Sequence, residues 1–261
     1  METVVCQSYH RDPPPWVARC LQSVEAWAAR HGHAYAFEGD ALFDRLPGRL
    51  VDKTAGRAAI QADVARLLWA RDLLDQGADR VVWLDADVFV VAPEAFRVPV
   101  TREYAFGRET WVQGDGRGRF RVRRNVHNAA CVFVRGNSVL DFLIHAALSV
   151  LERADPRHIA PQMVGPKLLT ALDGIVGFPL WDDAGMLAPP VLADVAAGGP
   201  EGDGPALARL RRHLPAPLNA ANLCLSLVDR ATDGVTLTPA TVTTAMDRLA
   251  AEGPVRPCNE S

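Results

Sequence analysis

Apolar positions repeat with two different periods along the first ninety residues. Residues 3–9 (TVVCQSY) have the β-branched, alternating pattern of a strand, and residues 16–32 place apolar side chains at helical spacing. A short strand is expected at 33–37. The clearest helical pattern covers 57–76, where the apolar positions share one face, and the run RVVWLDADVFVV at 80–91 predicts a buried strand. This order of elements predicts a mostly parallel sheet covered by helices.

The pattern beyond residue 93 is less regular. It predicts strands at 103–112, 129–136 and 175–181, a loop or hairpin at 113–125, and helices within 138–154, 159–174 and 238–254. From about residue 193 the chain becomes rich in Gly, Pro and Ala, which predicts a flexible loop. We therefore expect an α/β domain over residues 1–192, with a flexible loop and C-terminal extension packed on it over 193–261.

Composition narrows the class of protein. The 261 residues are 49% hydrophobic and 23% charged, which suits a globular core, and the formal charge of −3 gives no general reason to expect a nucleic-acid partner. The five cysteines are scattered without a Cys-x-x-Cys pair. No apolar run is long enough to span a bilayer, and the first ten residues lack the features of a secretory signal. These features predict a soluble, cytoplasmic protein.

Two aspartates, Asp85 and Asp87, interrupt the apolar run at 80–91. Residues i and i+2 of a strand point to the same side, so both carboxylates are expected to face one spot at the carboxyl end of a buried strand. Two convergent carboxylates suit Mg²⁺ or Mn²⁺, completed by water and substrate phosphates. The alternative is a polar strand end whose aspartates cap backbone groups.

Other polar groups are candidates on their own chemistry. Asp63 and Arg66 are three residues apart on the predicted helix, and this spacing makes them neighbours on its surface. An ordinary helical ion pair has the same spacing. The arginines between 117 and 124 could bind phosphates, form a lid, or simply keep a sheet edge solvated. Asp182 and Asp183 follow an apolar strand and are candidate general bases, although an Asp-rich turn has the same pattern.

The segment at 63–91 (DVARLLWARDLLDQGADRVVWLDADVFVV) resembles the core of nucleotide-sugar-dependent glycosyltransferases of the GT-A fold. The similarity is to members with a sugar-binding Asp-x-Asp region, such as capsular-polysaccharide and mannosyltransferase-like enzymes. Three further segments, at 13–37, 125–138 and 163–172, resemble other parts of these enzymes in the expected order. The resemblance implies a GT-A, Rossmann-like sheet in the nucleotide-sugar-binding and catalytic domain.

The resemblance also implies roles on the donor side. Asp87 would coordinate a divalent metal on the donor diphosphate, while Asp85 would contact the ribose or sugar and share the metal site. Asp63 and Arg66 match an Asp-x-x-Arg motif that contacts the donor sugar, and Asn128 would lie near the sugar or the acceptor. The match is imperfect, because alanines follow Asn128 where the family usually has glycine.

On the acceptor side, Gly165 and Pro166 would shape the pocket. Asp182 and Asp183 remain the candidate bases. The C-terminal His or Trp motif that often completes the metal site in this family has no clear copy; His213 is the nearest candidate and also suits an ordinary surface position.

The leading hypothesis is a metal-dependent, hexosyltransferase-like enzyme. It would move a sugar from a UDP- or GDP-sugar to a hydroxyl of a carbohydrate, lipid-linked or small-molecule acceptor. A second hypothesis is a haloacid-dehalogenase-like phosphatase with Asp85 as nucleophile and Asp87 as acid/base. The residues VFVV that follow Asp87 do not match the turn which that fold prefers. A third is a nucleotide-sugar binder without turnover.

Overall fold

A computed structural model describes residues 1–99, 103–198 and 203–258. Its centre is a six-stranded sheet in the order β2-β1-β3-β6-β5-β7. The β1–β2, β1–β3 and β5–β7 pairs are parallel, and β6 runs antiparallel to β3 and β5. The strands are β1 (Thr3–Ser8), β2 (Ala34–Glu38), β3 (Arg80–Leu84), β5 (Tyr104–Gly114), β6 (Phe120–Val134) and β7 (Leu180–Trp181). The mostly parallel α/β fold predicted from the sequence is therefore confirmed.

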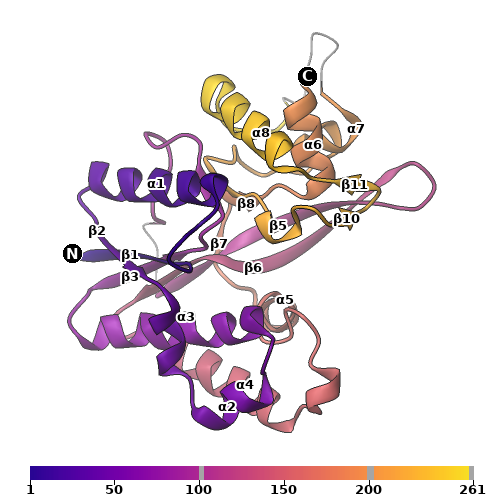
Figure 1. The fold of residues 1–261 in the computed structure, drawn as a ribbon. Helices are drawn as coiled ribbons and strands as arrows, with labels where there is room; N and C mark the ends of the chain where they lie inside the picture. Colours follow the sequence, from indigo (N-terminus) through magenta and orange to yellow (C-terminus); the bar gives the residue numbers. More distant parts are fainter. Residues whose placement is uncertain (100–102, 199–202, 259–261) are drawn as a thin grey trace.

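Helices cover both faces of this sheet (Figure 1). On one face α3 (Ala58–Asp75), α4 (Leu140–Arg153) and α5 (Pro166–Val176) enclose an apolar core, and the short α2 (Gly48–Lys53) lies beside them. On the other face α1 (Pro15–Arg30) packs on the sheet through a second core that includes Trp27. Pro15 lies at the first turn of α1, where its missing N–H costs no helical hydrogen bond. None of the helices in the described ranges is both long and apolar enough to cross a membrane.

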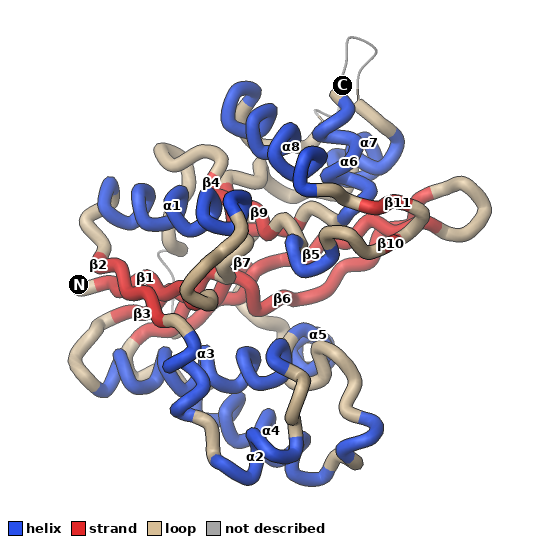
Figure 2. The backbone as a smooth tube through the Cα atoms, in the orientation of Figure 1, coloured by secondary structure: helices blue, strands red, loops and turns tan. Residues whose placement is uncertain are grey.

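The expected single strand at 80–91 is wrong. β3 ends at Leu84, the chain turns through Asp85–Asp87, and β4 (Val88–Val90) joins a different sheet, of order β4-β9-β8, with β9 (Ala220–Asn222) and β8 (Ala184–Met186). The Val88 N–H donates to the Asp85 carbonyl at 3.0 Å, which closes the turn. Because the strand is broken, the directions of the two carboxylates follow from the turn and not from strand alternation. Figure 2 shows β4 and β9 beside α1, away from the main sheet.

The C-terminal elements enclose a third core. It packs α6 (Pro189–Ala197), α7 (Pro205–Arg211) and α8 (Pro239–Glu252) against the small sheet, and the short pair β10 (Ala231–Thr232) and β11 (Val235–Thr236) lies beside them. Helix α6 continues through residue 193, so the chain is still helical where the sequence predicted the start of a loop; residues 199–202 of that loop lie outside the described part. The predicted strand at 175–181 is also shorter, because α5 extends through Val176.

Candidate functional site

Four polar residues from three elements form what we call the aspartate–arginine cluster: Asp63, Arg66, Asp85 and Asn128. Arg66 Nη1 donates to Asp85 Oδ1 at 2.6 Å and to the Asn128 carbonyl at 2.9 Å. Arg66 Nη2 lies 3.3 Å from Asp63 Oδ1, which also accepts a hydrogen bond from Asn128 Nδ2 at 2.7 Å. Asp63 and Arg66 are 6% and 7% exposed, so they are buried and not the surface neighbours expected from their spacing.

Burial makes this cluster energetically interdependent. Burial raises the pKa of Asp63, while the charge of Arg66 and the amide of Asn128 act to lower it. Burial opposes the charge of Arg66 as well, but the nearby Asp85 and Asp63 outweigh it and raise the arginine pKa. Leaving one charge of such a buried set unpaired costs about 3–5 kcal/mol. The cluster is therefore a fixed arrangement of charges, and it orients Asp85 at the carboxyl end of β3.

Asp87 lies at the start of β4 and is wrapped by the end of β9. Its Oδ1 accepts from Asn222 Nδ2 at 2.5 Å and its Oδ2 from the Leu225 N–H at 3.1 Å. Burial, followed by the charge of Asp85, raises the pKa of Asp87 to about 7. Asn222 has no sequence motif that marks it, and only the long-range pairing of β4 with β9 reveals it. The turn thus holds two carboxylates close enough to repel each other.

These two carboxylates suit a hard divalent cation. Mg²⁺ and Mn²⁺ prefer oxygen ligands, and Mg²⁺ is usually held by one or two carboxylates together with water and substrate phosphates. A cation there would relieve the repulsion that raises the Asp87 pKa. In the described ranges no three His, Cys, Asp or Glu side chains gather as a ready-made metal cage. Asp85 and Asp87 therefore have the ligand chemistry that such a cation prefers.

Glu109 is a further buried carboxylate near this turn, and no sequence motif marks it. It lies on β5, is 8% exposed, and accepts a hydrogen bond from Asn125 Nδ2 at 2.8 Å. Burial raises its pKa. After burial itself, the charges of Asp87, Glu109 and Asp85 all act to raise the pKa of Cys224. Within the described residues Glu109 has no ion-pair partner, which leaves it available to accept a proton.

Gly165 and Pro166 begin α5 directly against the aspartate–arginine cluster. A Cβ at Gly165 would lie 2.5 Å from Asp63 Oδ2 and 2.8 Å from Asn128 Nδ2, closer than side chains approach. Thr170, one turn further along α5, accepts from the Val126 N–H at 3.0 Å and so ties the helix to β6. Glycine is required here by the close approach of backbone to cluster.

Asp182, Asp183 and His213 have other partners. Asp182 pairs with Arg108 at 2.6 Å, and Asp183 accepts from Asn219 at 3.1 Å. Both precede β8, near the start of β9, whereas Asp87 is held at the end of β9.

His213 follows α7, where its Nδ1 lies 3.0 Å from the Arg209 carbonyl. Among the described residues, no hydrogen bond or ion pair connects these three side chains with Asp85 or Asp87. Their predicted roles stay predictions.

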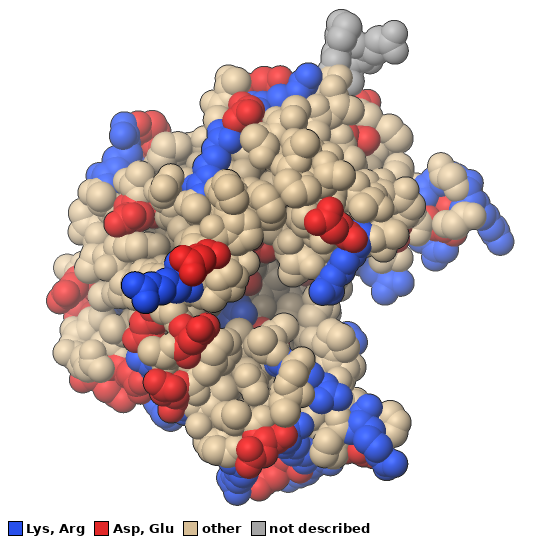
Figure 3. Space-filling model, viewed as in Figure 1, with Lys and Arg blue, Asp and Glu red and all other residues tan. Residues whose placement is uncertain are grey.

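The molecular surface has a hollow between the half that contains α3, α4 and α5 and the half that contains α6, α7 and α8 (Figure 3).

Comparison with known proteins gives structural likeness only. No family model and no curated protein sequence matches the chain. A glycosyltransferase involved in glycosylation of the major capsid of PBCV-1 aligns over 72% of this chain and 86% of its own, with 12% identity and a TM-score of 0.42.

A Drosophila beta-1,4-galactosyltransferase 7 mutant in complex with manganese, UDP-Gal and xylobiose covers 64% of this chain and 69% of its own, at 10% identity and a TM-score of 0.29. The structure of A197 from STIV covers 66% of this chain and 77% of its own, also with 10% identity and a TM-score of 0.29. Two of these three structures are glycosyltransferases.

Proposed function

We propose that this protein is a metal-dependent, hexosyltransferase-like glycosyltransferase that moves a sugar from a nucleoside-diphosphate sugar to a hydroxyl acceptor. The observation that carries the proposal is the turn at Asp85–Asp87, where the carboxylate of Asp85, held in the aspartate–arginine cluster, lies close enough to that of Asp87 to raise its pKa. Ligands of open α/β sheets bind outside the carboxyl ends of the strands, which is where β3 delivers this turn. A diphosphate held through a cation at this turn would place its sugar toward the cluster.

We assign each side chain a role according to its position in the site. Asp85 and Asp87 would hold Mn²⁺ or Mg²⁺, and the bound ion would supply Lewis-acid stabilisation of the diphosphate leaving group. Arg66 fixes Asp85 through the 2.6 Å contact, and Asp63 and Asn128 would offer hydrogen-bonding groups to the donor sugar. The α5 start at Gly165 and Pro166 would bound the acceptor side, because it packs on the same cluster.

We propose Glu109 as the general base, ahead of Asp182 and Asp183, because it is buried and makes no ion pair among the described residues, whereas Asp182 pairs with Arg108. The acceptor oxygen would attack the anomeric carbon, the bond from that carbon to the diphosphate oxygen would break, and the acceptor proton would pass to the Glu109 carboxylate. Burial raises the pKa of Glu109 toward the range in which a general base works. We expect Glu109→Gln to lower kcat by at least about a hundredfold, with a small change in donor KM. Asp182→Asn, at the pair with Arg108, should change kcat less; the reverse order would assign the base to that aspartate.

The donor site is tested by calorimetric titration of UDP and GDP into the purified protein, first with Mn²⁺ and then with EDTA. We expect one nucleotide to bind only with the metal, and Asp87→Asn to lose at least about tenfold in affinity, which corresponds to about 1.4 kcal/mol. Asp75→Asn, on the exposed end of α3, is the matched control and should bind as the wild type does. Thermal unfolding followed by circular dichroism verifies that each variant is folded.

Failure to bind either nucleotide with metal present would overturn the proposed function. Hydrolysis of an aryl phosphate that depends on Asp85 would instead support the phosphatase hypothesis. Nucleotide-sugar binding without transfer to any tested hydroxyl acceptor would support a binder without turnover.

A further inference from the structure

Five arginines line an open groove outside the candidate donor site. Arg117, Arg119 and Arg121 come from the β5–β6 hairpin, and Arg209 and Arg212 come from α7 and the residue after it. The groove has a volume of about 850 Å³. The hairpin projects from the body of the molecule below α7 (Figure 1), and blue side chains gather on it in Figure 3.

The positive charge of this groove is largely uncompensated. Asp115 is its single acidic lining residue, and it is already used by the hairpin turn, where it accepts from the Arg117 and Arg119 N–H groups and pairs with the Arg119 side chain at 3.1 Å. Within the described ranges the side chains of Arg117, Arg121, Arg209 and Arg212 make no ion pair with an acidic side chain.

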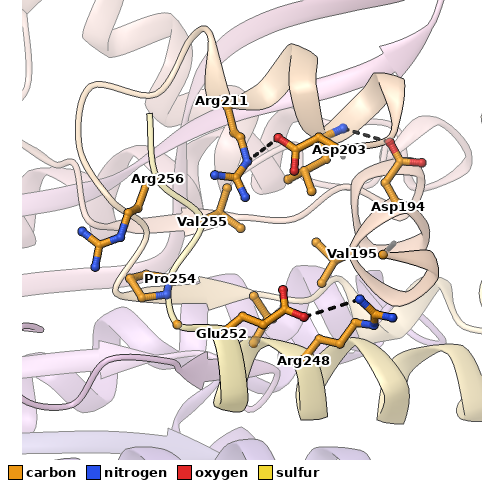
Figure 4. A pocket seen from close by; sticks show the side chains of 13 residues that line it. Asp194, Val195, Asp203, Arg211, Arg248, Glu252, Pro254, Val255 and Arg256 are labelled. Carbon is orange, nitrogen blue, oxygen red and sulfur yellow. Dashed lines mark hydrogen bonds and ion pairs between the residues drawn. The ribbon is translucent and has the colours of Figure 1, made fainter. Parts of the chain in front are cut away.

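The neighbouring cavity between α6, α7 and α8 provides a contrast (Figure 4). That cavity, of about 450 Å³, also has charged walls. There Arg211 pairs with Asp203 at 2.7 Å and Arg248 with Glu252 at 3.4 Å, and the lining as a whole has as many acidic residues as arginines. The groove lacks such partners among the described residues, which indicates that its counter-charges come from outside the chain.

Arg209 provides a second indication of a ligand. Its side chain is half-buried, and its Nε is shielded from solvent yet has no hydrogen-bond partner among the described residues. A buried donor left without a partner costs about 1–3 kcal/mol. An anion in the groove would remove that cost, because a guanidinium fork matches the oxygens of a phosphate.

We propose that this groove binds the phosphate groups of an extended, phosphate-bearing glycan acceptor; the acceptor role rests on the proposed glycosyltransferase function. Strand β5 connects the two places: Gly114, at the start of the hairpin turn, is five positions after Glu109, which is about 17 Å of strand. Arg121 pairs with Gln113 and so lies on the same face of the β5–β6 hairpin as Glu109. An acceptor chain that runs along this face would have its phosphates near Arg121 and its free hydroxyl toward Glu109. The groove thereby selects anionic chains over neutral ones.

The lining favours phosphates on a glycan over a nucleic acid. Proteins that bind single strands combine arginines with several aromatic platforms for base stacking. The lining residues include one aromatic side chain, Phe120, and the chain as a whole carries a formal charge of −3. The groove thus offers phosphate contacts without a stacking surface.

The test uses a fluorescein-labelled inorganic polyphosphate as probe, titrated with the full chain and followed by fluorescence anisotropy. We expect salt-sensitive binding that Arg121→Gln and Arg209→Gln each weaken by about tenfold, with the slope of log affinity against log salt reduced by about 1 per arginine removed. Arg153→Gln, which removes an exposed arginine at the end of α4, is the matched control and should bind the probe normally.

Two competitors and one parallel titration separate the outcomes. Loss of affinity in Arg153→Gln equal to that of the groove variants would overturn the proposal, as would tighter binding of a single-stranded oligonucleotide or of anionic lipid vesicles. The groove variants should retain the metal-dependent nucleotide binding of the wild type. Polyphosphate binding without any nucleotide binding would leave an anion groove but refute the transferase, whereas the reverse would refute only the groove.

Discussion

The absence of a side chain at Gly165 allows α5 to pack directly against the aspartate–arginine cluster. The cluster is packed so closely against the start of α5 that any Cβ there would press on Asp63 and Asn128. Gly174 lies on the exposed side of the same helix, where an added Cβ would meet nothing within 4 Å. These two glycines therefore offer opposite outcomes for the same substitution.

We expect Gly165→Ala to lower the free energy of unfolding by about 1–3 kcal/mol, because overpacking a tight site displaces its neighbours. It should also weaken metal-dependent nucleotide binding, since Asp63 and Asn128 must move. Gly174→Ala should raise the free energy of unfolding by about 0.5–1 kcal/mol, as expected for glycine to alanine inside a helix. Urea denaturation of both variants measures the two effects, and a stable Gly165→Ala with unchanged binding would contradict the close packing at α5.

Site residues with local signals could be predicted from the sequence, and those with long-range partners could not. Asp63, Arg66 and Asp85 stand out because helix spacing and the end of an apolar run are local features. Asn222 contacts Asp87 across 135 positions of the chain, and nothing within ten residues of it indicates that pairing. Glu109 lies among alternating strand residues, and its partner Asn125 comes from the neighbouring strand β6, sixteen positions away.

Among the elements, β6 has two roles, because it is central to the sheet and also reaches into the site. Its His127 is 1% exposed, lies 3.0 Å from the Ala184 carbonyl through Nε2, and accepts from the Ala129 N–H through Nδ1. This arrangement requires a neutral ring with its proton on Nε2. Burial is the main cause that lowers the pKa of His127 to about 4.

The consequence is a specific pH dependence of stability. As pH falls below about 6.5 the unfolded chain protonates this histidine, while the folded ring stays neutral until about pH 4. The free energy of unfolding contributed by His127 is therefore fully present above about pH 6.5 and lost as pH falls toward 4, by about 3 kcal/mol. Denaturation curves of the wild type and His127→Gln, compared between pH 7 and 4, isolate this contribution. His145→Gln is the control and should lose stability as the wild type does, whereas an equal loss in His127→Gln would contradict the assignment.

Helices and strands were predicted with different success for a physical reason. Helix α3 carries its own periodic signal, and so its bounds agree with the expected 57–76 within one residue at each end. The break of 80–91 into β3 and β4 has no local cause in an apolar run. It follows from which distant strands pair with each half, since β3 joins β1 and β6 while β4 joins β9.

For the whole molecule, the buried cysteines report on the integrity of two of the three cores, because Cys6 and Cys131 lie in the core under α3 and Cys20 lies in the C-terminal core. Cys6, Cys20, Cys131 and Cys224 are buried, and burial is the largest cause that raises the pKa of each thiol. Cys258 is exposed. Only a thiolate attacks a thiol reagent, so buried thiols are inert while the fold persists.

We expect Ellman's reagent to modify one thiol of the native protein, Cys258, and all five in urea. Cys258→Ser should abolish the native reaction and leave the rest for the unfolded chain. A second fast thiol in the native protein would show that one of the cores opens locally. The same assay, repeated with the two glycine variants, measures how each substitution affects that opening.

The turn at Asp85–Asp87 joins β3 of the large sheet to β4 of the small one, and it places one carboxylate on each side of the junction. A rotation of one sheet against the other that is taken up at this turn would change the separation of the carboxylates. Cation affinity would therefore depend on the relative orientation of the two sheets. A substitution between α6 and α8 that tilts the small sheet would change the cation affinity, although every residue near the ion stays the same.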